Sequence, residues 1–145
     1  MADMSNTPPT LSTPRYGAPI TLELAQRVAQ AAQCEARRNR WPIVIAIVDS
    51  AGHLVLLQRL DQAQLGSIEV ARQKAQTAVY FRRPTKRFED ALAQGGLHLR
   101  LLGMTNLTPL VVDGEVVGAI GVSGMQSHED AQVAQAGAAA LGSVH

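Results

Sequence analysis

Apolar positions in the first half of the chain recur at the spacing of a helix and then run without interruption. Thr21 is a suitable cap for a helix that continues to about Asn39, with an apolar stripe made of Leu24, Ala25, Val28, Ala29 and Ala32. After Pro42, residues 43–48 are all apolar, which predicts a strand buried on both faces. A turn at 49–52 and a second strand at 53–60 complete a predicted hairpin.

The second half of the chain is predicted to contain two helices, a second hairpin and a closing helix. Ser67 is predicted to cap a helix over about 68–81, and Thr85 a shorter helix that ends near residue 94. Residues 97–108 fit either a loop over the core or a short strand. The Asp113–Gly114 pair predicts a tight turn between strands at 110–112 and 115–123, because this dipeptide adopts positive φ values readily. An alanine-rich helix over about 128–141 follows.

This order of elements predicts one α+β domain in a chain of 145 residues, which is long enough to bury a core. Helices and hairpins alternate as α-β-β-α-α-β-β-α, without the β-α-β repeats of a parallel sheet. We therefore expect an antiparallel sheet flanked by helices over residues 20–145. Residues 1–19 are polar and rich in proline, which predicts a flexible N-terminal arm.

The strand at 115–123 carries the most informative side-chain pattern. One face holds larger residues, whereas the other holds Val117, Ala119, Gly121 and Ser123 and has little bulk near its end. A packed helix, a partner subunit or a ligand must come close there. Gly124 and a helix start follow, with Ser127 as the expected N-cap and Asp130 as the reciprocal capping carboxylate. This combination predicts either a tight turn for helix packing or a site for an anionic or polar ligand.

Lys74 is the charged residue with the least usual position. It lies within the apolar stripe formed by Val70, Ala71, Ala75 and Ala78 instead of opposite to it. A lysine placed in this way must extend its amine to solvent, pair with a carboxylate, contact an anionic ligand or lose its proton. A structural ion pair and a substrate or cofactor contact are both consistent with the pattern. In a catalytic site, Lys74 would serve as a cation or a base.

Composition excludes several classes of function. The net charge is only +1 and aromatic residues make up 3% of the chain, so we expect no binding to nucleic acid. No apolar run approaches the ~20 residues that cross a bilayer, and residues 1–19 lack the basic and apolar regions of a signal peptide. We therefore expect no membrane association and a cytoplasmic location.

The chain has few residues of the types that usually bind metals. A single cysteine, Cys34, excludes an internal disulfide and a cysteine-based zinc site. The four histidines, His53, His98, His128 and His145, are not at metal-ligand spacing, so no metal site is predicted. His128 is the one beside the turn at Gly121–Gly124, where it fits either a ligand contact or an exposed first-turn residue. Known catalytic motifs, including the nucleophile elbow and phosphate loops, are absent.

The chain resembles the GlcG/HbpS family, also called DUF336, which includes the C-terminal domain of PduO-type proteins. The resemblance covers about residues 21–141 and rests on the segments 48–52, 59–61, 71–78 and 114–124, together with Asp130. It implies a profilin-like antiparallel sheet flanked by helices, self-association into homo-oligomers and, in some members, haem binding. In the family, haem binding has been linked to a histidine near the first helix, and residues 21–39 contain none.

Three functions remain open at this point. The first is a small-molecule binding protein of a catabolic or cofactor pathway, with an anionic or carbonyl-bearing ligand; haem is an alternative ligand. Its expected contacts are Gly121, Ser123, Gly124, His128 and Asp130. The second is a small enzyme in which Lys74 acts on a polar intermediate. The third is an oligomerising accessory module without a ligand.

Overall fold

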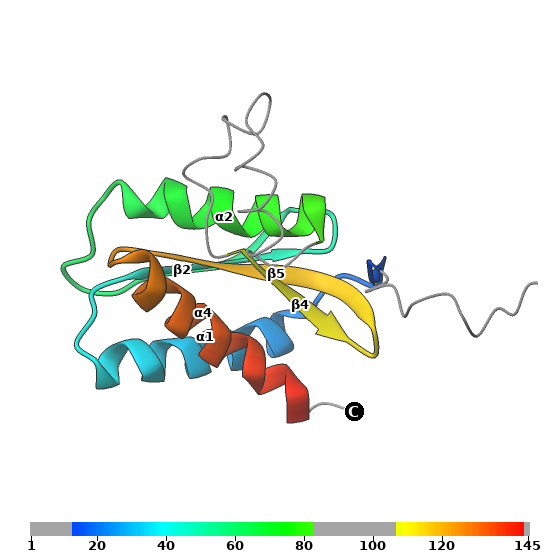
Figure 1. The fold of residues 1–145 in the computed structure, drawn as a ribbon, viewed down its shortest axis with the longest axis horizontal. Helices are drawn as coiled ribbons and strands as arrows, with labels where there is room; N and C mark the ends of the chain where they lie inside the picture. The colour runs from blue at the N-terminus through cyan, green and yellow to red at the C-terminus, as the bar shows by residue number, and fades with distance from the viewer. Residues whose placement is uncertain (1–12, 83–106, 144–145) are drawn as a thin grey trace, which may run out of the picture.

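The computed structural model describes residues 13–82 and 107–143 (Figure 1). The predicted hairpins and the three longer helices are all present. In chain order, the elements are β1 (Arg15–Tyr16), α1 (Leu22–Arg38), β2 (Val44–Asp49), β3 (Leu54–Arg59), α2 (Ser67–Phe81), β4 (Thr108–Val112), β5 (Glu115–Ser123), α4 (Ser127–Ala139) and the 3-10 helix η3 (Ala140–Ser143). The predicted helix near 85–94, most of the segment 97–108, His98 and His145 lie outside the described residues.

The sheet is built around β5. Its strand order is β1-β5-β2-β3, and β4 also pairs with β5. The pairs β2–β3, β2–β5 and β4–β5 are antiparallel, as the hairpin pattern predicts. The two-residue strand β1 adds a parallel pair, with Arg15 opposite Glu115, so the sheet is mixed. So short a strand with two exposed side chains has no alternation that a sequence pattern reveals.

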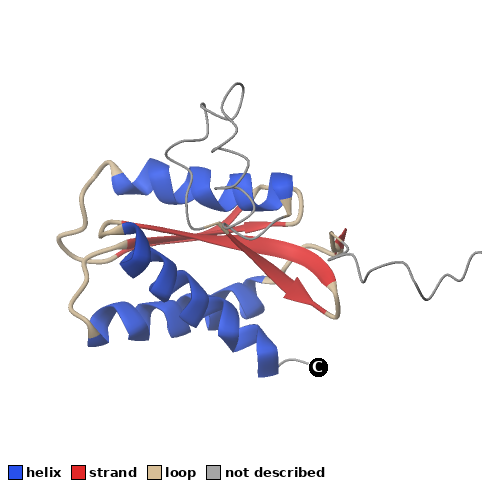
Figure 2. Ribbon diagram, in the orientation of Figure 1, coloured by secondary structure: helices blue, strands red, loops and turns tan. Residues whose placement is uncertain are grey.

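Helices cover the sheet as two unequal layers. Helix α2 lies on one face, and α1 with α4 lies on the other (Figure 2). The layer between the sheet and α2 contains many small side chains, among them Ala46 and Ala119 of the sheet and Ala71, Ala75 and Ala78 of the helix. The opposite face contributes larger side chains, among them Ile43, Ile45, Ile47, Ile120 and Val122. The sheet therefore admits one helix very closely on its small face and packs two helices against its bulky face.

Two predicted helix starts are shifted by one residue. Thr21 caps α1 as expected, because its hydroxyl accepts a hydrogen bond from the Leu24 N–H at 3.2 Å. The prediction for Ser67 is wrong, since Gly66 is the N-cap of α2 and Ser67 is its first helical residue. Ser127 is likewise the first residue of α4 after the N-cap Gln126. Both serines lie one position too late in the chain to cap these helices.

The end of the predicted N-terminal arm packs against α2. The Tyr16 hydroxyl donates a hydrogen bond to the Val79 carbonyl at 2.7 Å, and the Arg82 guanidinium lies 4.6 Å from the centre of the Tyr16 ring. Cations are attracted to aromatic faces at this distance. These contacts fix β1 to the C-terminal end of α2. Residues 1–12 of the expected arm lie outside the described residues.

Candidate functional site

Gly121 is where α2 approaches the sheet most closely. A Cβ atom at this position would lie 2.0 Å from the Ala71 carbonyl oxygen and 2.7 Å from the Ala75 nitrogen. Only glycine fits at such a distance. Of the three partners that the sequence left open for this face, the structure places a helix against Gly121.

Lys74 of α2 is buried, with 5% of its surface exposed. Its Nζ donates to the Val122 carbonyl oxygen at 2.9 Å and forms an ion pair with Asp130 Oδ2 at 3.4 Å. Of the alternatives that the sequence left open for Lys74, the structure shows the pairing with a carboxylate. An ammonium group has three donors, and two are directed at protein oxygens.

Asp130 is the partner that holds this lysine, and it has a second structural contact. Its Oδ1 accepts a hydrogen bond from the Met125 N–H at 3.0 Å, five residues earlier in the chain. Burial raises the pKa of Asp130 above its ordinary value of 3.8, and the Met125 N–H and the Lys74 ammonium partly offset this rise. The expected capping role belongs to Glu129 instead, because Glu129 Oε1 accepts from the Gln126 N–H at 3.2 Å.

The Lys74–Asp130 pair joins the two helical layers around the end of β5. Lys74 comes from the helix on one face, and Asp130 comes from the first turn of α4 on the other. Between them, Gly124 has a φ of +145° and lies so near β2 that a Cβ would be 2.7 Å from the Pro42 oxygen. The pair therefore holds the turn between Ser123 and Gln126 in place.

Most of the residues predicted for the site meet at this end of the sheet. Ser123 and Asp130 are buried, and Gly124 lies between them and the start of β2. His128 is exposed on the first turn of α4, so it lies at the outer rim. His53 is also exposed, on the turn between β2 and β3. The structure thus brings Lys74, Ser123, Gly124 and Asp130 together and leaves His128 accessible.

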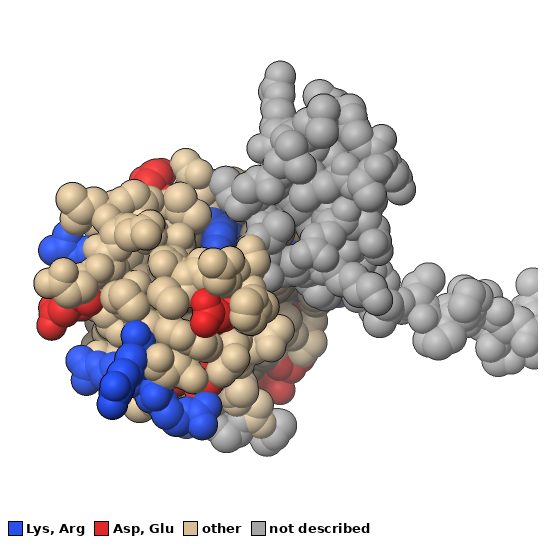
Figure 3. Space-filling view, turned by 60° about the vertical axis from the view of Figure 1, so that its left-hand side comes forward, with Lys and Arg blue, Asp and Glu red and all other residues tan. Residues whose placement is uncertain are grey.

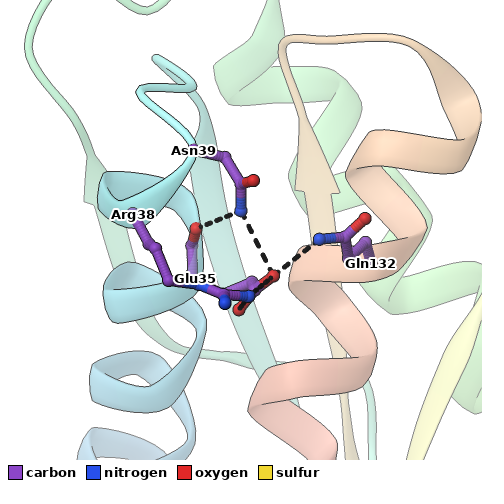
Figure 4. A network of polar contacts seen from close by, with 4 residues as sticks. All are labelled: Glu35, Arg38, Asn39 and Gln132. Atoms are coloured by element: carbon purple, nitrogen blue, oxygen red, sulfur yellow. Dashed lines mark hydrogen bonds and ion pairs between the residues drawn. The ribbon is translucent and has the colours of Figure 1, made fainter.

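A second polar cluster links α4 to α1, and the sequence did not indicate it (Figure 4). Glu35 Oε2 accepts hydrogen bonds from Gln132 Nε2 at 2.6 Å, from Arg38 at 2.7 Å and from Asn39 Nδ2 at 3.2 Å. Hydrogen bonds from Gln132 and then Arg38 lower the pKa of Glu35. Gln132 and Glu35 are far apart in the chain, and a helix with polar surface positions gives no signal for such a contact.

Two further features of the described residues bear on function. Within 13–82 and 107–143, no three His, Cys, Asp or Glu side chains gather in a way that would hold a metal ion. Over the same ranges, none of the helices combines the length and the apolar character that crossing a bilayer requires.

Comparison with known proteins identifies relatives of this fold. Residues 20–139 match the family model described as haem degrading protein HbpS-like. Protein GlcG of Escherichia coli K12 is 37% identical over 108 residues, which is 72% of this chain and 81% of GlcG.

Solved structures agree with this relation. A PduOC:heme complex has 30% identity and a TM-score of 0.74, covering 85% of this chain and 95% of that one. A double mutant of HbpS from Streptomyces reticuli has 35% identity and a TM-score of 0.76, covering 86% of this chain and 88% of the other.

Proposed function

We propose that this chain, which belongs to the HbpS-like family, is a small-molecule binding protein whose ligand carries an anionic or carbonyl group. One observation carries the proposal: a protein with the same fold and 30% identity has been solved as a complex with haem. Haem belongs to the proposed class, because its propionates are carboxylates. Fold alone does not define a ligand, so the proposal also requires a site on this chain.

The site that we propose is the outer rim of the sheet end where β5 runs into α4. Gly124 and His128 lie there, with Ser123 buried just beneath, and His128 is accessible to a ligand. Lys74 and Asp130 satisfy each other below this rim, so we assign them to positioning the turn and not to direct ligand contact. A catalytic function for Lys74 would require the amine to leave the Val122 carbonyl and Asp130.

Haem is the second candidate ligand, favoured by the description of the family model and by the PduOC:heme complex. His128 is the exposed histidine at the proposed site and is therefore the axial ligand that we would test. Native mass spectrometry of the purified protein tests the wider proposal. A co-purifying small molecule with acidic or carbonyl groups is the expected result.

A haem titration followed by absorbance tests whether haem is the ligand. Ligation through His128 predicts a Soret shift that His128→Ala abolishes and that the matched variant His53→Ala, altered at another exposed histidine, preserves. A shift that survives His128→Ala contradicts this assignment. If mass spectrometry finds no ligand and haem does not bind, the proposed binding function is wrong and an accessory function becomes the better explanation.

We also propose that the chain forms a homo-oligomer in a cytoplasmic setting. The small-residue face that first indicated close association is covered by α2. Exposed apolar side chains near and along α2, namely Leu65, Val70 and Tyr80, offer a different contact surface. Sedimentation at micromolar concentration tests the oligomer, and a monomer across the whole concentration range would contradict it.

A further inference from the structure

A groove of about 670 Å³ opens between the C-terminal end of α1 and the end of β3. It contains none of the residues assigned to the rim of β5 and α4. Figure 1 places the C-terminal end of α1 at the left of the molecule, and Figure 3, which brings this side forward, shows basic side chains gathered toward its lower edge. The groove is therefore a separate feature of the surface, with its own charge.

Arginines dominate the charge of this groove. Arg37, Arg40 and Arg59 line it and are exposed, whereas Asp61 is the one acidic residue among the described residues that line it. No hydrogen bond or ion pair to another described residue is found for these three guanidinium groups. The helix dipole accounts for Arg37 in the last turn of α1, but it does not account for Arg59, which lies on β3. Guanidinium groups bind carboxylates and phosphates through paired hydrogen bonds.

One residue that lines the groove has a buried polar atom without a partner among the described residues. Gln58 lines the groove, and its Oε1 is buried with no donor found for it among the described residues. A buried acceptor that lacks a donor is unfavourable and is rare in folded proteins. Because Oε1 is closed to solvent, the Gln58 side chain must turn toward the groove before a hydroxyl group of a bound molecule supplies the missing donor. Trp41 and Leu60, both half-buried, provide apolar surface beside it.

The backbone around the groove is held in an unusual conformation. Arg40 and Gln62 both line the groove and have positive φ values, +60° and +69°. At Arg40 this conformation ends α1, because the Trp41 N–H donates to the Ala36 carbonyl at 2.9 Å as in many helix C-termini, whereas Gln62 lies in the loop after β3. The two residues therefore flank the same groove from two different loops.

We propose that this groove binds a small organic anion that carries a carboxylate or phosphate together with hydroxyl groups. Arg37, Arg40 and Arg59 bind the acidic groups, while the Gln58 side chain turns toward the groove so that its Oε1 accepts a hydrogen bond from a hydroxyl. Asp61 accepts from a further hydroxyl and disfavours anions that have none. The proposal rests on the geometry of the groove and is independent of the function proposed for the rim of β5 and α4.

The only tryptophan of the chain, Trp41, lies in the groove and makes binding there directly measurable. We would titrate the protein with citrate, with tricarballylate, which lacks the hydroxyl of citrate, and with glucose 6-phosphate. Ionic strength is held constant with sodium chloride, and calorimetry accompanies the Trp41 fluorescence. We expect saturable binding of citrate or glucose 6-phosphate, which distinguishes the carboxylate from the phosphate source. We also expect tricarballylate to bind more weakly than citrate.

Two arginine variants decide whether the groove is responsible. Arg59→Gln should weaken binding about tenfold, the effect of losing one charge-assisted hydrogen bond. Arg72→Gln is the matched control, because Arg72 is a surface arginine of α2 that pairs with Glu69 and does not line the groove. Unchanged affinity in Arg59→Gln, equal losses in both variants, or no saturation by fluorescence and calorimetry would each overturn the proposal.

Discussion

Helix α4 is linked by polar side chains to α2 through Asp130 and, two residues later, to α1 through Gln132. The first link is buried, with 6% of the Lys74 side chain and 5% of the Asp130 side chain exposed, and its ion pair spans 3.4 Å. The second is a shorter contact of 2.6 Å between Gln132 and Glu35, in which the glutamate also binds residues of its own helix. The same helix thus uses a buried charge pair on one side and a hydrogen-bonded surface network on the other.

The two carboxylates respond to these surroundings in opposite directions. Burial raises the pKa of Asp130, because removal from water disfavours the charged form. Hydrogen bonds from Gln132 and Arg38 lower the pKa of Glu35, because they favour the charged form. A buried pair is strongly destabilising to break but contributes little net stability when intact. We therefore infer that the buried link mainly fixes the position of α4 relative to α2. The surface link mainly stabilises the fold through its electrostatic interactions.

Replacement of Lys74 is expected to have the largest effect on stability. Lys74→Met keeps much of the apolar volume and should retain the fold. It leaves the Asp130 carboxylate buried without its cation, so we expect the free energy of unfolding at pH 7 to fall by about 3–5 kcal/mol. Denaturant unfolding followed by circular dichroism measures this loss.

The control for this variant is Arg72→Met on the same helix. Arg72 forms a surface ion pair with Glu69, and such pairs contribute little to stability because water and salt screen them. Equal losses of unfolding free energy in the two variants would show that the Lys74–Asp130 pair is no more important for stability than a surface ion pair. A smaller loss for Lys74→Met at acidic pH is also expected, because Asp130 is then free to take up a proton.

The second-largest effect is expected from Gly121→Ala, which disturbs the Lys74–Asp130 link by changing the packing of α2 on β5. The new methyl group would meet the backbone of α2 and push that helix away from β5. Overpacking of this kind costs about 1–3 kcal/mol, and it should also lengthen the Lys74–Asp130 contact. Gly142→Ala is the matched control, since a Cβ there meets nothing within 4 Å. Thermal unfolding of both variants checks the prediction, and similar midpoints would contradict it.

Sequence patterns predicted some features around the Lys74–Asp130 link and missed others, for physical reasons. The position of Lys74 within an apolar stripe is local information, and it predicted that the lysine would need a carboxylate or a ligand. Its partner Asp130 is 56 residues away, so the sequence placed that residue in a helix cap instead. The close approach at Gly121 was predictable from side-chain size, but the identity of the approaching group depended on how α2 packs.

The surface link had no comparable signal. Glu35 and Gln132 each occupy an ordinary polar position of a helix, and 97 residues separate them. Hydrophobic periodicity predicts which side of a helix is buried, but it does not predict which polar residues meet across two helices. The groove beside Trp41 was missed for a related reason: Arg37 and Arg40 lie at and just beyond the end of α1, whereas Arg59 lies on β3 in a separate part of the chain.

The pH dependence of stability should separate the two carboxylates by sign. The raised pKa of Asp130 means that the folded state holds this proton more tightly than the unfolded chain does. Its contribution is therefore full below about pH 3.8 and declines as the pH rises through the folded-state pKa. The lowered pKa of Glu35 has the opposite effect. The contribution of Glu35 to the stability of the fold is present above about pH 4.5 and is lost as the pH falls through the folded-state pKa.

Two variants measure these opposite slopes. The difference in unfolding free energy between wild type and Glu35→Gln should grow as the pH rises toward 4.5 and then level off. The corresponding difference for Asp130→Asn should shrink as the pH rises from 3.8. Unfolding by denaturant between pH 3 and pH 7 provides the data. If the two free-energy differences changed with pH in the same direction, the proposed contrast between the buried and the surface link would be wrong.

Gln132→Ala should produce the smallest effect, because it removes one donor from Glu35 and leaves Arg38 and Asn39 in place. Loss of one exposed hydrogen bond should lower the melting temperature by about 1–2 °C. The pKa of Glu35 should rise toward 4.5, since the hydrogen bond from Gln132 is the main cause of its lowering. Calorimetry and NMR titration measure the two quantities. Gln135→Ala, at an exposed position of the same helix, is the control, and equal effects in both variants would mean that the link to α1 does not stabilise α4.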